Sequence, residues 1–156
     1  MGLKLESWVE EKFDGYLDHA GKPYYGHCEF VADFARQYAE ALGLSVHDVE
    51  VVYQSGLCHD LLEDTGTDVA ELLAMTSREV VEIVSVLTHS PDMPYEVYFE
   101  QVKTNRLATV VKLADTAHNA MLTRFDREDR SQVVREDCQR YTNRFLDMQK
   151  TILSWQ

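Results

Sequence analysis

Apolar residues recur every three or four positions along almost the whole chain, and this helical period constrains the fold more than any other sequence feature. Residues that favour turns are scarce, since the 156 residues include only seven Gly and three Pro. This composition disfavours an architecture of many short strands and tight turns. The sequence predicts an all-α fold: a single compact bundle of six to eight helices, formed by one domain over residues 1–156.

Several of the expected helices have recognisable ends. Gly43 is typical of the residue that follows a helix, and Ser45 of the cap that precedes the next one. Gly56 is expected to allow close helix packing. The last apolar stripe is interpreted as core, with a homodimer through this stripe as the open alternative. It consists of Val134, Cys138, Tyr141, Phe145, Met148, Ile152 and Trp155. The predicted helices cover roughly residues 3–17, 27–42, 46–63, 67–74, 79–87, 94–102, 105–122 and 134–155.

Charge and cysteine content narrow the classes of function. A net charge of −12 repels nucleic acids and anionic membranes, so neither is an expected partner. The three Cys are odd in number and form no C-x-x-C pair, which favours reduced thiols and a cytoplasmic location. The charged N-terminus does not resemble a signal peptide, and no apolar stretch is long enough to cross a bilayer.

Polar residues interrupt three otherwise apolar stripes. His27 begins one stripe, His59 and Asp60 end another, and Asp115 lies inside a third. A buried carboxylate without a partner is costly, so each acid needs one. One divalent metal would satisfy all four side chains, and imidazole with carboxylate suits Mn²⁺, Fe²⁺ or Zn²⁺. Helix bundles build metal sites in this way.

Two further acids, Glu63 and Asp64, lie one helical turn beyond His59 and Asp60. In this position they are expected to hold a water molecule whose pKa the metal lowers, and to take its proton.

A second His-Asp pair serves as an internal control. His47 and Asp48 follow Ser45 in the first turn of a helix, where Asp48 fits a capping role. We interpret this pair as structural, so the dipeptide alone indicates little.

Each interruption also has a simpler explanation when taken singly. His27 fits a hydrogen-bonded core or loop position, and Asp115 a buried partner of Lys112 or Arg106. Glu63 fits a solvated helix face, and Asp64–Gly66 fit the end of a helix. The coincidence of all the interruptions favours the metal site.

The pattern resembles the HD-domain metal-dependent phosphohydrolases, and more closely the hydrolase domain of the RelA/SpoT family, including the small alarmone hydrolases. The similarity spans roughly residues 13–150, with three motifs in the family's order and spacing. These motifs are G-x-P-Y-x-x-H at Gly21–His27, H-D-x-x-E-D-T at His59–Thr65 and V-K-L-A-D-x-x-H-N at Val111–Asn119.

The resemblance implies a helical hydrolase that removes pyrophosphate from the 3′ position of guanosine tetra- or pentaphosphate ((p)ppGpp), a small phosphorylated nucleotide. It implies a divalent metal, usually Mn²⁺, with Fe, Zn, Co, Ni or Mg as alternatives. The implied roles are metal binding by His27, His59, Asp60 and Asp115; water activation by Glu63 and Asp64; substrate ordering by Asn119; and phosphate contact by Lys112 and Arg106.

The chain departs from the family pattern near the substrate. Residues Leu17–Ala20 stand where the family has a basic stretch, Cys28 replaces a proline, and Thr116 stands where the family has an arginine. Three alternatives therefore stay open: hydrolysis of another nucleotide such as a nucleoside monophosphate, a non-catalytic module that binds a nucleotide or a protein, and a purely structural helical protein.

Overall fold

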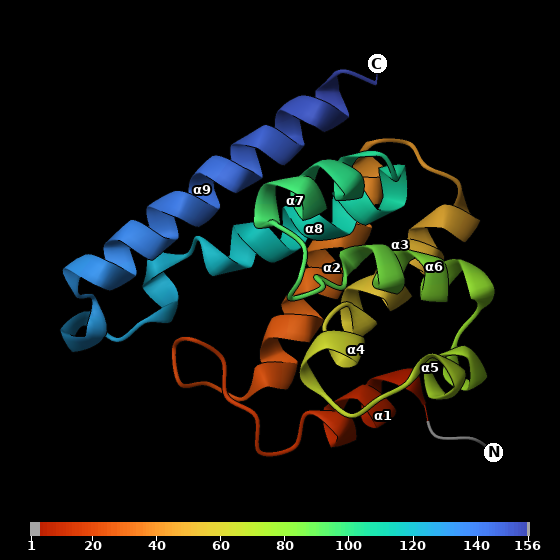
Figure 1. Ribbon diagram of the computed structural model, residues 1–156, viewed down its shortest axis with the longest axis horizontal. Helices are drawn as coiled ribbons and strands as arrows, with labels where there is room; N and C mark the ends of the chain where they lie inside the picture. The colour runs from red at the N-terminus through yellow and green to blue at the C-terminus, as the bar shows by residue number, and fades with distance from the viewer. Residues whose placement is uncertain (1–3, 156) are drawn as a thin grey trace.

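The computed structural model describes residues 4–155 and confirms the all-α fold. Within this range, eight α-helices of seven or more residues are joined by one single-turn helix and two 3-10 turns (Figure 1). Within the described residues, β-type pairing is limited to an isolated bridge between Leu17 and Pro23. The elements are α1 (Leu5–Lys12), α2 (Tyr24–Ala41), α3 (Val46–Cys58), α4 (Leu61–Asp64), α5 (Val69–Met75), α6 (Arg78–Leu87), α7 (Tyr95–Lys103), α8 (Arg106–Asn119), η1 (Leu122–Arg124), η2 (Arg127–Asp129) and α9 (Gln132–Leu153).

Helices α2, α3 and α8 pack against one another at the centre, and α6 covers α3 and α8. Helices α2 and α3 approach closely at Gly56, where an added Cβ would lie 2.7 Å from the Cα of Ala32. The predicted role of Gly56 in close helix packing is therefore confirmed. The three central helices carry the residues of the candidate site, so their packing fixes its geometry.

The predicted boundary between α2 and α3 holds to within one residue, whereas α5 and α9 each begin two residues away from their predicted starts. The side chain of Ser45 accepts a hydrogen bond of 3.0 Å from the backbone N–H of Asp48, and Gly43 has a φ of +75°. Helix α2 begins at Tyr24, three residues earlier than expected, with Pro23 as its N-cap. Proline fits there because the first backbone N–H groups of a helix have no helical partner.

The first helix is shorter than predicted. It ends at Lys12, and Gly15 follows with a φ of +80°, a left-handed conformation that a helix cannot include. Tyr16 thus lies outside the helix and is 42% exposed instead of joining the apolar face. Leu3, where this helix was expected to begin, lies outside the described residues.

The last helix is core along only part of its length. Met148 and Ile152 join the main core, and Cys138 is buried, as predicted. Val134 and Tyr141 do not join that core, because the first half of α9 extends past the body of the bundle (Figure 1). All three cysteines are free thiols. No helix among residues 4–155 is long and apolar enough to cross a membrane.

Candidate active site

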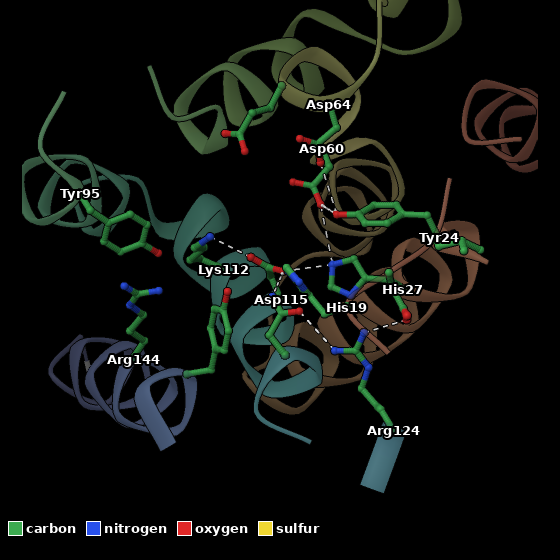
Figure 2. Close-up of a pocket in the computed structure, with 15 residues that line it drawn as sticks. His19, Tyr24, His27, Asp60, Asp64, Tyr95, Lys112, Asp115, Arg124 and Arg144 are labelled. Carbon is green, nitrogen blue, oxygen red and sulfur yellow. Dashed lines mark hydrogen bonds and ion pairs between the residues drawn. The ribbon is translucent and has the colours of Figure 1, made fainter. Parts of the chain in front are cut away.

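Three distant segments bring the four predicted ligand residues together (Figure 2). His27 lies near the start of α2, Asp115 lies in α8, and His59 and Asp60 follow the end of α3. The Nε2 atom of His27 lies 3.1 Å from Asp115 Oδ1 and 3.8 Å from Asp60 Oδ2. The Nε2 atom of His59 lies 2.8 Å from Asp60 Oδ2 and 3.6 Å from Asp115 Oδ1. Both imidazoles are buried, so these atoms form one cluster largely shielded from solvent.

A break in the helix creates this geometry and corrects the prediction of one helix over residues 46–63. Helix α3 ends at Cys58, and Asp60 adopts φ −104° and ψ 1°, in the sparsely populated bridge region, before α4 begins at Leu61. In an unbroken helix, adjacent side chains point about 100° apart. The break instead brings the Asp60 carboxylate against the His59 ring. Periodicity alone cannot reveal such a one-residue break.

The tautomer of His59 favours a bound cation. Its Nδ1 lies 2.7 Å from the carbonyl oxygen of Gly56, and only an N–H can donate to that acceptor. In the neutral ring Nε2 therefore presents a lone pair, and no neighbouring group donates a hydrogen bond to this buried atom. It faces the oxygens of Asp60 and Asp115, which carry lone pairs as well. A divalent metal with nitrogen and oxygen ligands fits this donor set.

The charge balance at His59 leads to the same conclusion. Burial opposes protonation of His59, but the carboxylates of Asp60 and Asp115 outweigh burial and raise its pKa well above the usual value. The carboxylates thus favour positive charge at Nε2, which a proton can supply and which a metal ion would supply in its place.

His118 completes the cluster, although the sequence indicated no role for it beyond its place one turn after Asp115. Its Nδ1 lies 2.6 Å from Nδ1 of His27. Burial, together with the charges of His27 and Arg124, lowers the pKa of His118 to about 3, so its ring is neutral and can accept a hydrogen bond from His27. That bond would leave the Nε2 lone pair of His27 facing the carboxylates. Metal-binding histidines commonly donate their other ring N–H to a neighbouring group in this way, which fixes the tautomer.

Asp115 is held from two sides within α8. Lys112 Nζ donates to its Oδ2 at 2.8 Å, and Asn119 Nδ2 donates to its Oδ1 at 2.9 Å. Burial raises the pKa of Asp115, but the Lys112 cation and the imidazoles of His27 and His59 outweigh it and keep the pKa well below the usual value. Lys112 is thus the buried partner of Asp115 that the sequence indicated as an alternative to metal binding. In the structure Asp115 both pairs with Lys112 and faces the two histidines.

Glu63 and Asp64 lie beside the cluster in α4. Tyr24 donates a hydrogen bond to Asp60 at 2.5 Å and a longer one to Asp64 at 3.4 Å. Glu63 accepts a 2.6 Å hydrogen bond from the backbone N–H of His89, in the loop between α6 and α7. Burial, with the charges of Asp60 and Glu63, raises the pKa of Asp64 to about 6. A carboxylate in this range can both bind and release a proton near neutral pH.

The cluster opens into a pocket of about 390 Å³, a size that suits a small-molecule ligand. Besides the cluster, its walls include Lys112 and Asn119, as the sequence predicted, and further side chains that the sequence did not indicate. The latter include Asp18, Tyr95, Arg124, Tyr141 and Arg144.

Arg124 fixes the wall nearest the N-terminal loop. It donates to Asp18 at 2.7 Å, to the carbonyl of His118 at 3.1 Å and to Asn119 at 3.3 Å. Burial raises the pKa of Asp18, but Arg124 and backbone N–H donors outweigh it and lower the pKa below its usual value. Since Asp18 and Arg124 are 106 residues apart, no local motif indicates this pair.

Arg106 does not reach the pocket, in contrast to the expectation of a phosphate contact. It is exposed in the first turn of α8, with its guanidinium 5.0 Å from the ring centre of Trp155. The helix rises about 1.5 Å per residue, which places Arg106 roughly 13 Å from the level of Asp115. Arg106 therefore has a packing contact, and Lys112 alone of the two predicted phosphate contacts lines the pocket.

Comparisons with known proteins place the clustered residues within a known domain family. The model of the HD domain family matches residues 24–131, a range that contains all four clustered ligand candidates. Guanosine-3′,5′-bis(diphosphate) 3′-pyrophosphohydrolase MESH1 of zebrafish (Danio rerio) is 35% identical over 109 residues, which are 67% of this chain and 57% of the relative. The chain thus spans little more than half the length of that curated relative.

A solved structure shows the same fold. It is described as a metazoan ortholog of SpoT that hydrolyzes ppGpp and plays a role in starvation responses. The TM-score is 0.60 at 19% identity, over 96% of this chain and 92% of that one.

Proposed function

Because the chain belongs to the HD domain family, we propose that it is a metal-dependent phosphohydrolase that removes pyrophosphate from the 3′ position of guanosine tetra- or pentaphosphate. The observation that carries the proposal is the buried Nε2 of His59, which faces the carboxylates of Asp60 and Asp115, since both of these residues line a pocket of about 390 Å³. The name of the zebrafish relative supports the choice of substrate.

Four side chains would hold the metal: His27, His59, Asp60 and Asp115. We propose Mn²⁺, with Fe, Zn, Co, Ni and Mg as alternatives, because neutral imidazole and carboxylate ligands are compatible with all of these ions to differing degrees. A divalent ion in this position supplies Lewis acidity and makes water a better nucleophile at neutral pH. We further propose that the chain works as one domain, since its central helices share one hydrophobic core.

The remaining residues orient and transfer protons. Asp64 and Glu63 border the cluster on one side and are the proposed proton acceptors for the attacking water. Tyr24 keeps Asp60 in place through its hydroxyl. Lys112 and Asn119 hold Asp115, and both line the pocket, where their N–H groups would also be within reach of a phosphate.

The test is a nucleotide panel with metal-loaded protein. Metal content is measured first, and release of phosphate or pyrophosphate is then followed with ppGpp, nucleoside triphosphates and deoxynucleoside monophosphates in the presence of Mn²⁺. We expect pyrophosphate release from ppGpp that a chelator abolishes and that added Mn²⁺ restores.

Other outcomes would separate the alternatives. Cleavage of deoxynucleoside monophosphates but not of ppGpp would reject the proposed substrate and retain the phosphohydrolase. No release from any nucleotide by the loaded protein would favour a non-catalytic binding module. Absence of bound metal, together with His59→Ala and Asp115→Ala variants that change only stability, would favour a structural protein.

A further inference from the structure

The positive charges of the pocket are unequally compensated. Lys112 is paired with Asp115, and Arg124 is paired with Asp18, at 2.8 Å and 2.7 Å respectively. Both cations are largely buried, and their carboxylate partners neutralise them. A multiply charged phosphate compound entering a protein of net charge −12 would need positive charge that is not already compensated.

Arg144 in α9 is such a charge. Among residues 4–155 it has no carboxylate within ion-pair distance. Its guanidinium instead lies 3.9 Å from the ring centre of Tyr95 and 5.5 Å from that of Tyr141. All three side chains line the pocket.

Stacking leaves the guanidinium available for an anion. An arginine that lies over an aromatic face is held by the ring, while its N–H groups stay free to donate within their own plane. The planar fork of N–H donors matches two phosphate oxygens. Because Arg144 covers one face of Tyr95, that face is not open to a nucleobase. The arrangement therefore favours phosphate over base recognition.

The position of Arg144 separates it from the proposed reacting group. Figure 2 shows Arg144 and Tyr95 on one side of the pocket and Asp60, Asp64 and Tyr24 on the other, with Lys112 and Asp115 between them. A phosphate at Arg144 would thus belong to the same ligand as the phosphate at the cluster but to a different part of it.

We propose that Arg144, held between Tyr95 and Tyr141, binds a second phosphate group of the substrate, so that the site selects nucleosides phosphorylated at two ribose positions. This inference rests on the proposed function for the identity of the reacting group. For a 3′-pyrophosphohydrolase, the second group is the 5′-diphosphate.

The first experiment compares two substrates with the same reacting group. Hydrolysis of ppGpp and of guanosine 3′-diphosphate, which lacks the 5′ phosphates, is measured for wild type and Arg144→Gln. Loss of a charge-assisted hydrogen bond predicts a KM for ppGpp that rises about 10- to 100-fold, with kcat little changed. The kinetics with guanosine 3′-diphosphate should stay the same.

Arg140→Gln is the matched control. Arg140 lies one turn earlier in α9, is paired with Asp137 at 3.0 Å and lies 5.5 Å from the Tyr141 ring centre. This variant removes the same charge from the same helix, and we expect wild-type kinetics with both substrates. An equal defect of Arg144→Gln with both substrates, or no defect with ppGpp, would overturn the proposal.

A binding measurement keeps the inference separate from the proposed function. Titration calorimetry of guanosine 5′-diphosphate against the metal-loaded protein needs no turnover. We expect binding that weakens about 10- to 100-fold in Arg144→Gln and stays unchanged in Arg140→Gln. If wild type does not cleave ppGpp but shows this pattern, the proposed reaction fails and the phosphate subsite stands. Undetectable binding to wild type, or equal binding to both variants, would reject the subsite.

Variants of Tyr95 test how Arg144 is held. Tyr95→Phe keeps the ring and should retain both the affinity for guanosine 5′-diphosphate and the KM for ppGpp. Tyr95→Leu removes the ring face and should reproduce part of the Arg144→Gln defect. A Tyr95→Leu protein that folds and has wild-type affinity would contradict the stacking argument.

Discussion

The two His-Asp pairs of this chain share a dipeptide and differ in almost everything else. The side chain of His47 is 69% exposed and pairs with Glu79 at 2.7 Å, whereas that of His59 is 3% exposed. The backbone N–H of Asp48 donates to the Ser45 cap, as a first-turn residue should. The difference arises from where each pair lies in the bundle.

What distinguishes the second pair is the contribution of other helices. Helix α2 brings His27 and helix α8 brings Asp115 to the His59-Asp60 turn. Among the described residues, the groups of His, Cys, Asp and Glu close enough to share an ion all include Asp60, and none includes His47 or Asp48. A motif of two residues thus gains chemical meaning only through the residues packed against it.

The largest contrast is expected between Asp60→Ala and Asp48→Ala. Loss of a proposed ligand should weaken metal binding by more than about 100-fold, since even loss of a partner behind a ligand costs 10- to 100-fold. Phosphohydrolase activity should fall to background. Asp48→Ala should keep metal and activity and cost at most about 1 kcal/mol of stability. Metal analysis and turnover measurements check both. Unchanged metal content and turnover in Asp60→Ala would show that the site is wrongly assigned.

A second contrast separates metal binding from proton transfer. Asp64→Asn should reduce turnover about 100- to 10,000-fold while the protein still binds metal, because the amide cannot accept a proton. Glu79→Gln is the control from the other pair, and its turnover should match wild type. Loss of metal in Asp64→Asn would instead place Asp64 among the ligands.

A third contrast concerns the packing that brings α2 to the turn. In Gly56→Ala the new Cβ would meet backbone atoms of Ala32, so the helices must shift, at a cost of about 1–3 kcal/mol. Metal affinity should fall as well, because His27 and His59 move apart. Thermal unfolding and metal titration measure the two effects.

Gly26→Ala is the control for this change. Gly26 also lies in a helix but has no atom within 4 Å of its added Cβ. Alanine there should be neutral or stabilising by up to about 1 kcal/mol. Equal behaviour of the two variants would reject the close approach of α2 and α3 as the cause.

The smallest expected effect belongs to the cap of the first pair. Ser45→Ala removes the hydrogen bond to the Asp48 N–H and should cost about 1 kcal/mol, which lowers Tm by about 2–4 °C in a domain of this size. Metal content and turnover below the transition should not change. A fall in metal affinity would mean that the two pairs are coupled through α3.

The sequence predicted the helical fold, and it predicted which residues meet at the cluster. Both follow from periodicity, because a polar residue in an apolar stripe must face the interior. Periodicity could not predict the break between α3 and α4, since one bridge-region residue leaves the pattern of apolar positions almost unchanged. The phosphate contact of Arg106 was instead implied by the family resemblance, and the structure places this residue in the exposed first turn of α8, away from the pocket.

The substrate side of the pocket was the part least accessible to sequence analysis. Tyr95 and Arg144 are separated by 49 positions and come together only because α7 and α9 both pack against α8. Tyr141 was interpreted as core because it continues an apolar stripe. Tyr141 and Arg144 lie three residues apart in α9. Tyrosine and arginine at this spacing are common on helix surfaces, so the spacing does not indicate a binding site.

The hydrogen bond from the His89 backbone to Glu63 has an energetic consequence for the whole pocket. The ring of His89 lies 5.6 Å from that of Tyr95, and Tyr95 supports Arg144. The loop that contains His89 therefore connects Glu63, a proposed proton acceptor, with Arg144, which is proposed to bind the second phosphate. Free-energy changes from substitutions at Glu63 and Arg144 should then be non-additive, although the two side chains come from different helices. Binding of a phosphate at Arg144 would then alter the free energy of interactions at Glu63.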